Sequence, residues 1–440
     1  MQRSLSLDES PAFSLPARFF LAAPVFAVLA GSLAAWGGPD VFVSRWSPLT
    51  LGIVHLLVLG FLSSVMIGAL FQMLPVVAGV PIAFSRVASR LVPVALWAGT
   101  LLLAGGLILS NGTLTLSAIP LLVAALGGFG LLCLWSLRNA VSSTAMLRGV
   151  RLAVTALVAA AALGAAAAAL LGTGSGLAGL SFTSLVNAHA AWGLAGWLGL
   201  LVIAVAYQVV PMFQVTPTYP AWMSGWLAPV LFVLLALTSA MGAAGSGGMA
   251  QVAAALALMG SLASFAVTTL SLLRRRKRPQ ADPTTRFWHL SLASLLAAAC
   301  LGAAGSMMPG LTDAPAYSLV LGVLLIVGFG MSVVCGMLYK ILPFLVWYHL
   351  QNELAGGCQR APNVKQVISD AWALRHLGVH AVALGLLACA AGMAGTITGM
   401  EWKWLSHLAG LALAASGACL GANLYRAARL YYRSRPLNTA

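Results

Sequence analysis

The chain has 440 residues, and its composition excludes a water-soluble protein. Apolar residues make up 61% of the sequence and charged residues only 7%, whereas a soluble domain carries about 25% charged residues. The formal net charge is +15, and six cysteines are too few for a secreted disulfide scaffold of this length. The composition therefore predicts an all-α polytopic membrane protein.

Twelve apolar runs are long enough to cross a bilayer, which takes about 20 residues per helix. In chain order they cover 17–36, 49–76, 91–110, 115–136, 150–172, 183–212, 222–243, 249–273, 287–308, 316–345, 375–398 and 404–427. The loops between them are short and rich in Pro, Gly and Ser, apart from a polar segment at 346–374 that we expect to be a surface loop. The sequence thus predicts twelve transmembrane helices.

The basic residues indicate the orientation of these helices. If both termini are cytoplasmic and the spans alternate, all but two of the 23 Lys and Arg residues lie on the inner side; the exceptions are Arg45 and Lys403. This asymmetry follows the positive-inside rule, so we expect cytoplasmic N- and C-termini. The basic run at 274–278 is then expected to anchor a loop, and no nucleic-acid partner is predicted.

A short pattern occurs three times near the inner ends of predicted helices. It consists of an aromatic residue, Gln or Lys, two apolar residues and Pro, at 71–75, 207–211 and 339–343. Since Pro ends or kinks a helix, each copy is expected to close the second helix of a four-helix set. The near-equal spacing predicts three four-helix pseudo-repeats, 1–145, 146–280 and 281–440. The polar or aromatic positions of this helix-end motif are candidate functional residues: Gln72, Tyr207, Gln208, Tyr339 and Lys340.

Histidines inside the predicted spans are further candidates, because ionisable groups in a membrane are costly and usually functional. His55 and His189 occupy nearly equivalent places in the outer halves of the second and sixth helices, and His407 lies near the outer end of the twelfth. Each could ligate a haem iron or copper, or form a hydrogen bond between helices. His376 and His380, spaced i, i+4, are expected at the membrane interface beside a basic residue.

The acidic residues are informative because none lies inside a predicted helix core; all eight are in tails or loops. Cation-coupled carriers and proton pumps generally use buried Asp or Glu. A carboxylate-driven transporter is therefore disfavoured. The sequence also lacks the HExxH and GxxxxGK[ST] motifs and a GxSxG motif in a plausible context, which gives no support to zincin, P-loop or hydrolase chemistry.

The helix plan and a histidine on the outer half of helix 2 resemble subunit I of haem–copper oxidases and nitric oxide reductases. The segments that carry this likeness are HLLVLGF at 55–61, NAH at 187–189 and GW at 196–197 through YQVVPMF at 207–213. The resemblance implies that His55 ligates haem b, that His189 ligates copper, and that His407 or a Met supplies a second haem ligand. It also implies a bacterial inner membrane and a cytochrome c or another respiratory subunit as partner. A more distant resemblance is to the NnrS-type haem–copper membrane proteins.

The sequence departs from that family where its binuclear centre is built. The family has paired histidines on helix 7 and two on helix 10, but 222–243 and 316–345 contain none. The resemblance therefore predicts a degenerate relative that acts in electron transfer, nitric-oxide-related chemistry or respiratory assembly. Whether this relative is itself an oxidoreductase is not decided by the sequence. Two alternatives remain at this point: a transporter or channel lined by Gln72, Gln208 and Lys340, and a cofactor-free scaffold of a membrane complex.

Overall fold

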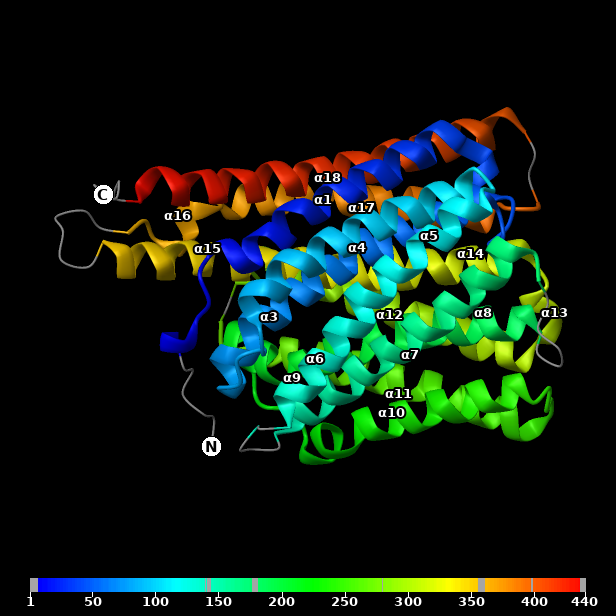
Figure 1. The fold of residues 1–440 in the computed structure, drawn as a ribbon, viewed down its shortest axis with the longest axis horizontal. Helices are drawn as coiled ribbons and strands as arrows, with labels where there is room; N and C mark the ends of the chain where they lie inside the picture. Colours follow the sequence, from blue (N-terminus) through cyan, green and yellow to red (C-terminus); the bar gives the residue numbers. More distant parts are fainter. Residues whose placement is uncertain are drawn as a thin grey trace.

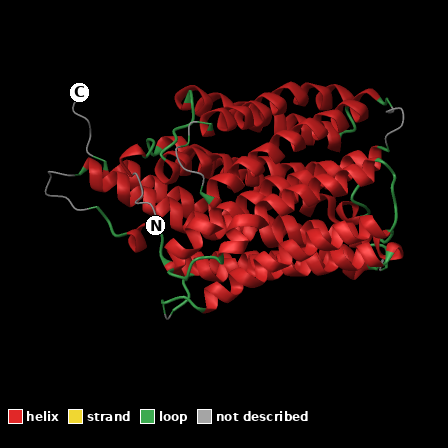
Figure 2. Cartoon of the chain, turned by 90° about the horizontal axis from the view of Figure 1, so that it is seen from below, coloured by secondary structure: helices red, strands yellow, loops and turns green. Residues whose placement is uncertain are grey.

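The structure, a computed structural model, describes residues 7–138, 140, 144–175, 181–278, 280–354, 361–396 and 399–435. All regular elements in these ranges are helical (Figures 1 and 2). Twelve helices in this part of the chain are long and apolar enough to cross a membrane. The predicted all-α membrane protein with twelve spans is thereby confirmed.

Eight of the crossings contain no π-helical segment. They are α1 (Ser14–Gly37), α4 (Ser85–Ile108), α7 (Ala145–Thr173), α10 (Ala221–Ala243), α11 (Met249–Arg274), α12 (Pro283–Met307), α17 (Asp370–Gly392) and α18 (Met400–Ser434).

The other four crossings contain a π-helical segment, in which the backbone hydrogen bonds run from i to i+5. They are α2 (Pro48–His55) with η3 (Leu56–Ser63) and α3 (Ser64–Ala78); α5 (Gly112–Leu122) with η4 (Val123–Gly128) and α6 (Phe129–Leu137); α8 (Phe182–Ala191) with η5 (Trp192–Leu200) and α9 (Leu201–Gln214); and α14 (Pro315–Val323) with η6 (Leu324–Met331) and α15 (Ser332–Glu353). The short elements are η1 (Leu7–Glu9), η2 (Gly38–Phe42), α13 (Pro309–Thr312) and α16 (Val364–Val367).

The long helices run side by side and alternate in direction, so that α1 begins and α18 ends at the same end of the bundle (Figure 1). We call this the terminal end, and the other the distal end. The helices α3, α6, α9 and α15 also finish at the terminal end, whereas α8, α13 and α14 lie at the distal end (Figure 1). This alternation is the arrangement expected of a polytopic membrane protein.

Three of the π-helical segments meet in the core of the bundle. The indole N–H of Trp197 in η5 donates to the hydroxyl of Ser63 in η3, over 3.1 Å. Gly330 in η6 lies between the other two segments, because a Cβ atom there would be 2.9 Å from the side chain of Leu198 and 3.1 Å from that of Leu62. A glycine at this position lets η3, η5 and η6 approach one another closely.

The tenth crossing extends further than the sequence predicts. We expected Pro343 to close this helix and 346–374 to form a loop, but α15 continues to Glu353. Its last turns place Leu345, Val346 and Leu350 in the core, each at most 1% exposed. The burial of these side chains outweighs the cost of a proline inside the helix, so tertiary packing sets the end of α15.

Candidate functional site

The structure brings His55 and His189 together, although 134 residues separate them in the chain. His55 is the last residue of α2 and His189 lies near the end of α8, both in the distal half of the bundle. Their ring centroids are 6.2 Å apart and their ring planes differ by 14°. Both side chains are half-buried. The two candidate histidines therefore form one site, which we call the histidine pair.

Both imidazoles of the histidine pair are held through the same nitrogen. The Nδ1 of His55 is 2.7 Å from the carbonyl oxygen of Leu51, and the Nδ1 of His189 is 2.9 Å from that of Ala160 in α7. A carbonyl oxygen only accepts hydrogen bonds, so Nδ1 carries the proton in each ring. In a neutral imidazole this leaves the lone pair on Nε2, which is the form that ligates metals.

Local structure explains why the two rings reach these positions. Gly164 in α7 leaves space for His189, since a Cβ atom there would be 2.6 Å from the Cε1 of the ring. The π-helical segments η3 and η5 begin one and three residues after the two histidines. π-Helical segments occur frequently at functional sites.

A basic residue from the distal loop between η2 and α2 reaches the helix that carries His189. The guanidinium of Arg45 donates to the Oδ1 of Asn187 over 2.7 Å and lies 4.5 Å from the ring centre of Trp46. Burial lowers the pKa of Arg45 relative to a free arginine. One of the two basic residues predicted on the outer side thus links this loop to α8.

His407 lies apart from the histidine pair, against the end of α1. Its Nδ1 is 2.6 Å from the carbonyl oxygen of Ala35, and its ring fills the space beside Gly38. The ring beside His55 is that of His189, whereas the resemblance names His407 or a Met as a second haem ligand. The ring of His407 could still act as a ligand, but its position is set by the packing of α18 against the end of α1.

The residues of the helix-end motif make separate contacts near the terminal end. The Nε2 of Gln72 donates to the hydroxyl of Ser10 over 2.9 Å, and Gln208 is half-buried on α9. The hydroxyl of Tyr207 donates to the carbonyl oxygen of Met223 over 3.0 Å.

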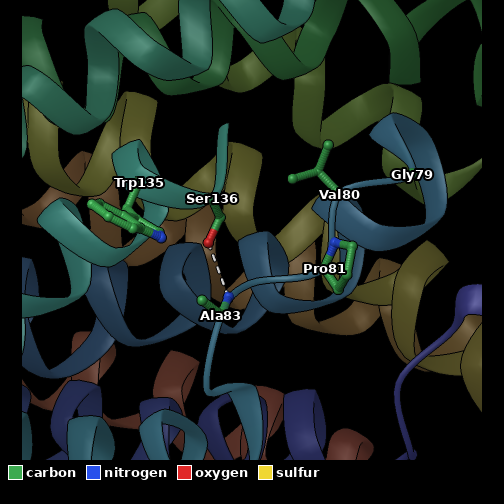
Figure 3. A pocket seen from close by; sticks show the side chains of 6 residues that line it. All are labelled: Gly79, Val80, Pro81, Ala83, Trp135 and Ser136. Atoms are coloured by element: carbon green, nitrogen blue, oxygen red, sulfur yellow. Dashed lines mark hydrogen bonds between the residues drawn. The ribbon is translucent and has the colours of Figure 1, made fainter. Parts of the chain in front are cut away.

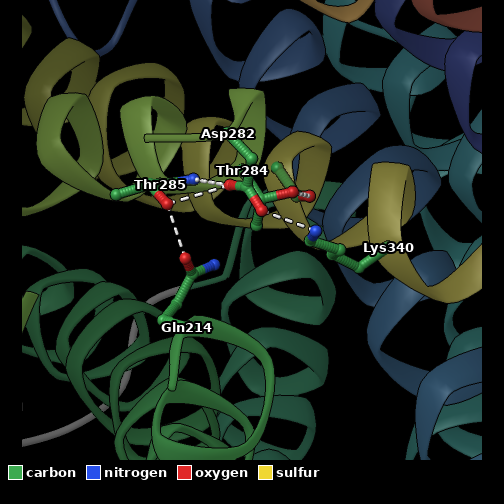
Figure 4. A network of polar contacts seen from close by, with 6 residues as sticks. Gln214, Asp282, Thr284, Thr285 and Lys340 are labelled. Carbon is green, nitrogen blue, oxygen red and sulfur yellow. Dashed lines mark hydrogen bonds and ion pairs between the residues drawn. The ribbon is translucent and has the colours of Figure 1, made fainter. Parts of the chain in front are cut away.

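Lys340 belongs to a polar network that joins α9, α12 and α15 (Figure 4). Its ammonium pairs with the carboxylate of Asp282 at 2.5 Å, and the hydroxyl of Thr285 lies within hydrogen-bond distance of carboxylate and amide oxygens of Asp282 and Gln214. Burial raises the pKa of Asp282, but the bonds from Lys340 and Thr285 outweigh it, so that the pKa is lowered overall. The ion pair and the contacts of Thr285 connect α9, α12 and α15 near the terminal end.

His376 and His380, which the sequence predicts at the membrane interface, have side chains that are buried between helices. Their side chains are 1% and 0% exposed. They belong to a continuous series of hydrogen-bonded side chains between α15, α17 and α18, which we call the buried polar chain. In order, its members are Tyr339, His376, Ser416, His380 and Ser332.

A pattern in the sequence could have revealed this chain. Ser332 and Tyr339 are seven residues apart on α15, and Ser416 and Asn423 are seven apart on α18, so each pair lies on one helix face. His376 and His380 share a face of α17 in the same way. Three matching polar faces in apolar helices indicate that these helices pack against one another through them.

A small hollow near the terminal end shares no lining residue with the histidine pair or the buried polar chain (Figure 3). It has a volume of about 190 Å³ and is lined by Gly79, Val80, Pro81, Ala83, Trp135 and Ser136. The backbone N–H of Ala83 donates to the hydroxyl of Ser136 across it, over 2.9 Å. Because its lining contains no charged side chain, the hollow is a weak candidate for catalysis or metal binding.

Comparison with known protein families finds no match, and comparison with curated proteins finds none either. Within the described ranges, no group of three or more His, Cys, Asp or Glu residues is placed to hold a metal ion.

Proposed function

We propose that this membrane protein holds one metal centre between His55 and His189, and that this centre is a haem b iron used in electron transfer or nitric-oxide-related chemistry. The observation that carries the proposal is the histidine pair itself: two imidazoles from different helices, each fixed by its Nδ1–H so that Nε2 offers a lone pair. A backbone carbonyl that accepts from the second ring nitrogen is typical of metal-bound histidine.

The separation of the rings would allow His55 and His189 to bind one metal through their Nε2 atoms. The observed separation is 6.2 Å. His55 and His189 would then serve the same metal, whereas the family resemblance assigns them to haem and copper separately.

The number of protein ligands favours haem over a bare metal ion. Zinc and Cu(II) sites usually need three or four ligands from the protein, and no third His, Cys, Asp or Glu joins the pair among the described residues. A haem iron takes only two axial ligands, since the porphyrin supplies the other four. When bound, the group would supply one-electron redox chemistry; copper is the second candidate, because imidazole also suits it.

The proposal includes a threefold repeat like that of haem–copper oxidase subunit I. In support, η3, η5 and η6 all begin 19 residues before the motif prolines Pro75, Pro211 and Pro343. Leu62, Leu198 and Gly330, which meet in the core, each precede these prolines by 13 residues. Equivalent residues that meet at one point are what three related units around a central axis produce.

The first test is a reduced-minus-oxidised visible spectrum of the purified full chain, with metal analysis on the same sample. We expect sharp haem bands at near-stoichiometric amounts. His55→Ala and His189→Ala should each lose haem or convert it to a high-spin form, because each removes one axial ligand. His407→Ala is the matched control: its ring is held by the same kind of Nδ1 bond, away from the pair, and its spectrum should match the wild type.

Other outcomes would replace the proposal. A folded protein that contains copper but no haem would assign the pair to copper. A folded protein without either, expressed with ample haem and copper, would refute the metal centre and direct attention to transport or a scaffold role. Bands that survive in His189→Ala without change would refute a shared metal.

A further inference from the structure

We propose that the buried polar chain is a proton relay that runs from near the terminal end toward the centre of the bundle. It lies between α15, α17 and α18, whereas the histidine pair is carried by α2 and α8. The inference therefore stands independently of the proposed metal centre.

The links of the chain are short and unbroken. The hydroxyl of Tyr339 is 2.9 Å from the Nδ1 of His376, and the Nε2 of that ring is 3.1 Å from the Oγ of Ser416. The same Oγ is 3.1 Å from the Nδ1 of His380, whose Nε2 is 3.0 Å from the Oγ of Ser332. All four ring nitrogens thus face a hydroxyl group.

Ser416 is the connection between the two imidazoles. The centroids of His376 and His380 are 5.9 Å apart and their planes are inclined by 58°, and the hydrogen bonds described for each ring meet at the Oγ of Ser416. A proton that passes between the rings along these bonds must use this hydroxyl.

Because each member can both donate and accept, the hydrogen bonds of the chain can all point in either direction. A neutral imidazole has one donor and one acceptor nitrogen, and a hydroxyl both donates and accepts. In one orientation Tyr339 donates to His376, and each following group donates to the next as far as Ser332. In the other orientation every one of these bonds is reversed.

A proton moves along such a chain without any member keeping a charge. Water near the terminal end gives a proton to the Tyr339 oxygen, each member passes its own proton onward, and Ser332 gives one to a water at the inner end. One proton enters and one leaves, and each ring changes its protonated nitrogen. Rotation of the hydroxyls and exchange of the ring tautomers restore the first orientation.

The two ends of the chain lie at different depths in the bundle. Tyr339 precedes Lys340, whose side chain is 23% exposed beside Asp282, and the Nδ2 of Asn423 donates to the tyrosine hydroxyl over 2.9 Å. Ser332 follows η6, which meets η3 and η5 in the core. Seven residues of α15 span about 10 Å, roughly a third of a ~30 Å hydrocarbon layer.

The test is hydrogen–deuterium exchange of the histidine ring N–H groups, followed by NMR of the full chain with ¹⁵N-labelled histidine in lipid nanodiscs. In the wild type we expect the rings of His376 and His380 to exchange within the dead time of the buffer change, while the backbone amides around them stay protected. Ser416→Ala removes the connecting hydroxyl. In a Ser332→Ala background, which closes the inner end of the relay, Ser416→Ala should slow exchange at His380 by about a hundredfold, the lower range of what a positioned proton donor contributes, and leave His376 unchanged.

Two further variants complete the test. Ser416→Thr keeps a hydroxyl and should retain fast exchange at His380. Ser406→Ala is the matched control: Ser406 is also fully buried on α18, but its hydroxyl donates to the carbonyl oxygen of Trp402, so both rings should behave as in the wild type. Slow exchange of both rings in the wild type would overturn the relay. So would a Ser416→Ala variant in the Ser332→Ala background in which both rings slow equally or neither slows.

Discussion

At the scale of single residues, the same kind of hydrogen bond positions three histidines in the distal half of the molecule. His55, His189 and His407 each turn Nδ1 to a backbone carbonyl oxygen. For two of them a glycine provides the space: Gly164 for His189 and Gly38 for His407. The hydrogen bond from Nδ1 fixes the tautomer of each ring, but only the packing of the surrounding helices decides which rings become neighbours.

Gly164→Ala tests how His189 is positioned. The added Cβ would lie 2.6 Å from the ring Cε1, closer than real contacts allow, so His189 must move. We expect a loss of about 1–3 kcal/mol in unfolding free energy, as for other overpacked sites, together with weaker binding of the metal centre. Thermal unfolding in detergent measures the first effect, and haem content the second.

Gly260→Ala is the control for this variant, because a Cβ atom there on α11 meets only open space. It should be neutral or slightly stabilising, since Ala favours a helix over Gly by about 1 kcal/mol. Equal behaviour of the two variants would mean that Gly164 does not position the histidine.

At the scale of helices, α1 and α18 pack through close contact of their backbones. A Cβ atom on Gly31 would be 2.2 Å from the backbone nitrogen of Ala414, and one on Gly410 would be 2.1 Å from that of Ala35. Small residues allow this approach in membranes, where helix association depends on packing and not on the hydrophobic effect. The contact also places His407, which lies one turn from Gly410, against the end of α1.

Gly410→Ala should separate these two helices. Because the added methyl group meets backbone atoms that cannot rotate away, we expect a loss of at least about 3 kcal/mol or a failure to fold. Purified yield and thermal stability in detergent measure the effect. Gly385→Ala on α17, where a Cβ atom has open space, should behave as the wild type; a stable Gly410→Ala protein would contradict the close packing of α1 and α18.

At the scale of the whole molecule, twelve crossings place the start of α1 and the end of α18 at the terminal end of the bundle. The arrangement fixes which loops share a side, and the basic residues favour the cytoplasm for the terminal end. Gly247 and Gln280 are exposed residues on either side of α11, at the distal and the terminal end respectively.

This orientation predicts the labelling of introduced cysteines. In a background without the native cysteines, a membrane-impermeant maleimide should label Gly247→Cys in intact cells, but Gln280→Cys only after permeabilisation. The reverse result would place the termini outside. Labelling of both sites in intact cells would contradict a crossing by α11.

The sequence by itself determined the twelve crossings, because a span needs only a long apolar run with few charges, and this property is local. It also singled out His55 and His189, since an ionisable group in an apolar run stands out. The tertiary structure decided the rest: that these two histidines are neighbours, that His407 is not, and that His376 and His380 are buried. These outcomes depend on which helix faces pack together and on how far α15 continues past Pro343, and such contacts between distant residues are not encoded in any local pattern.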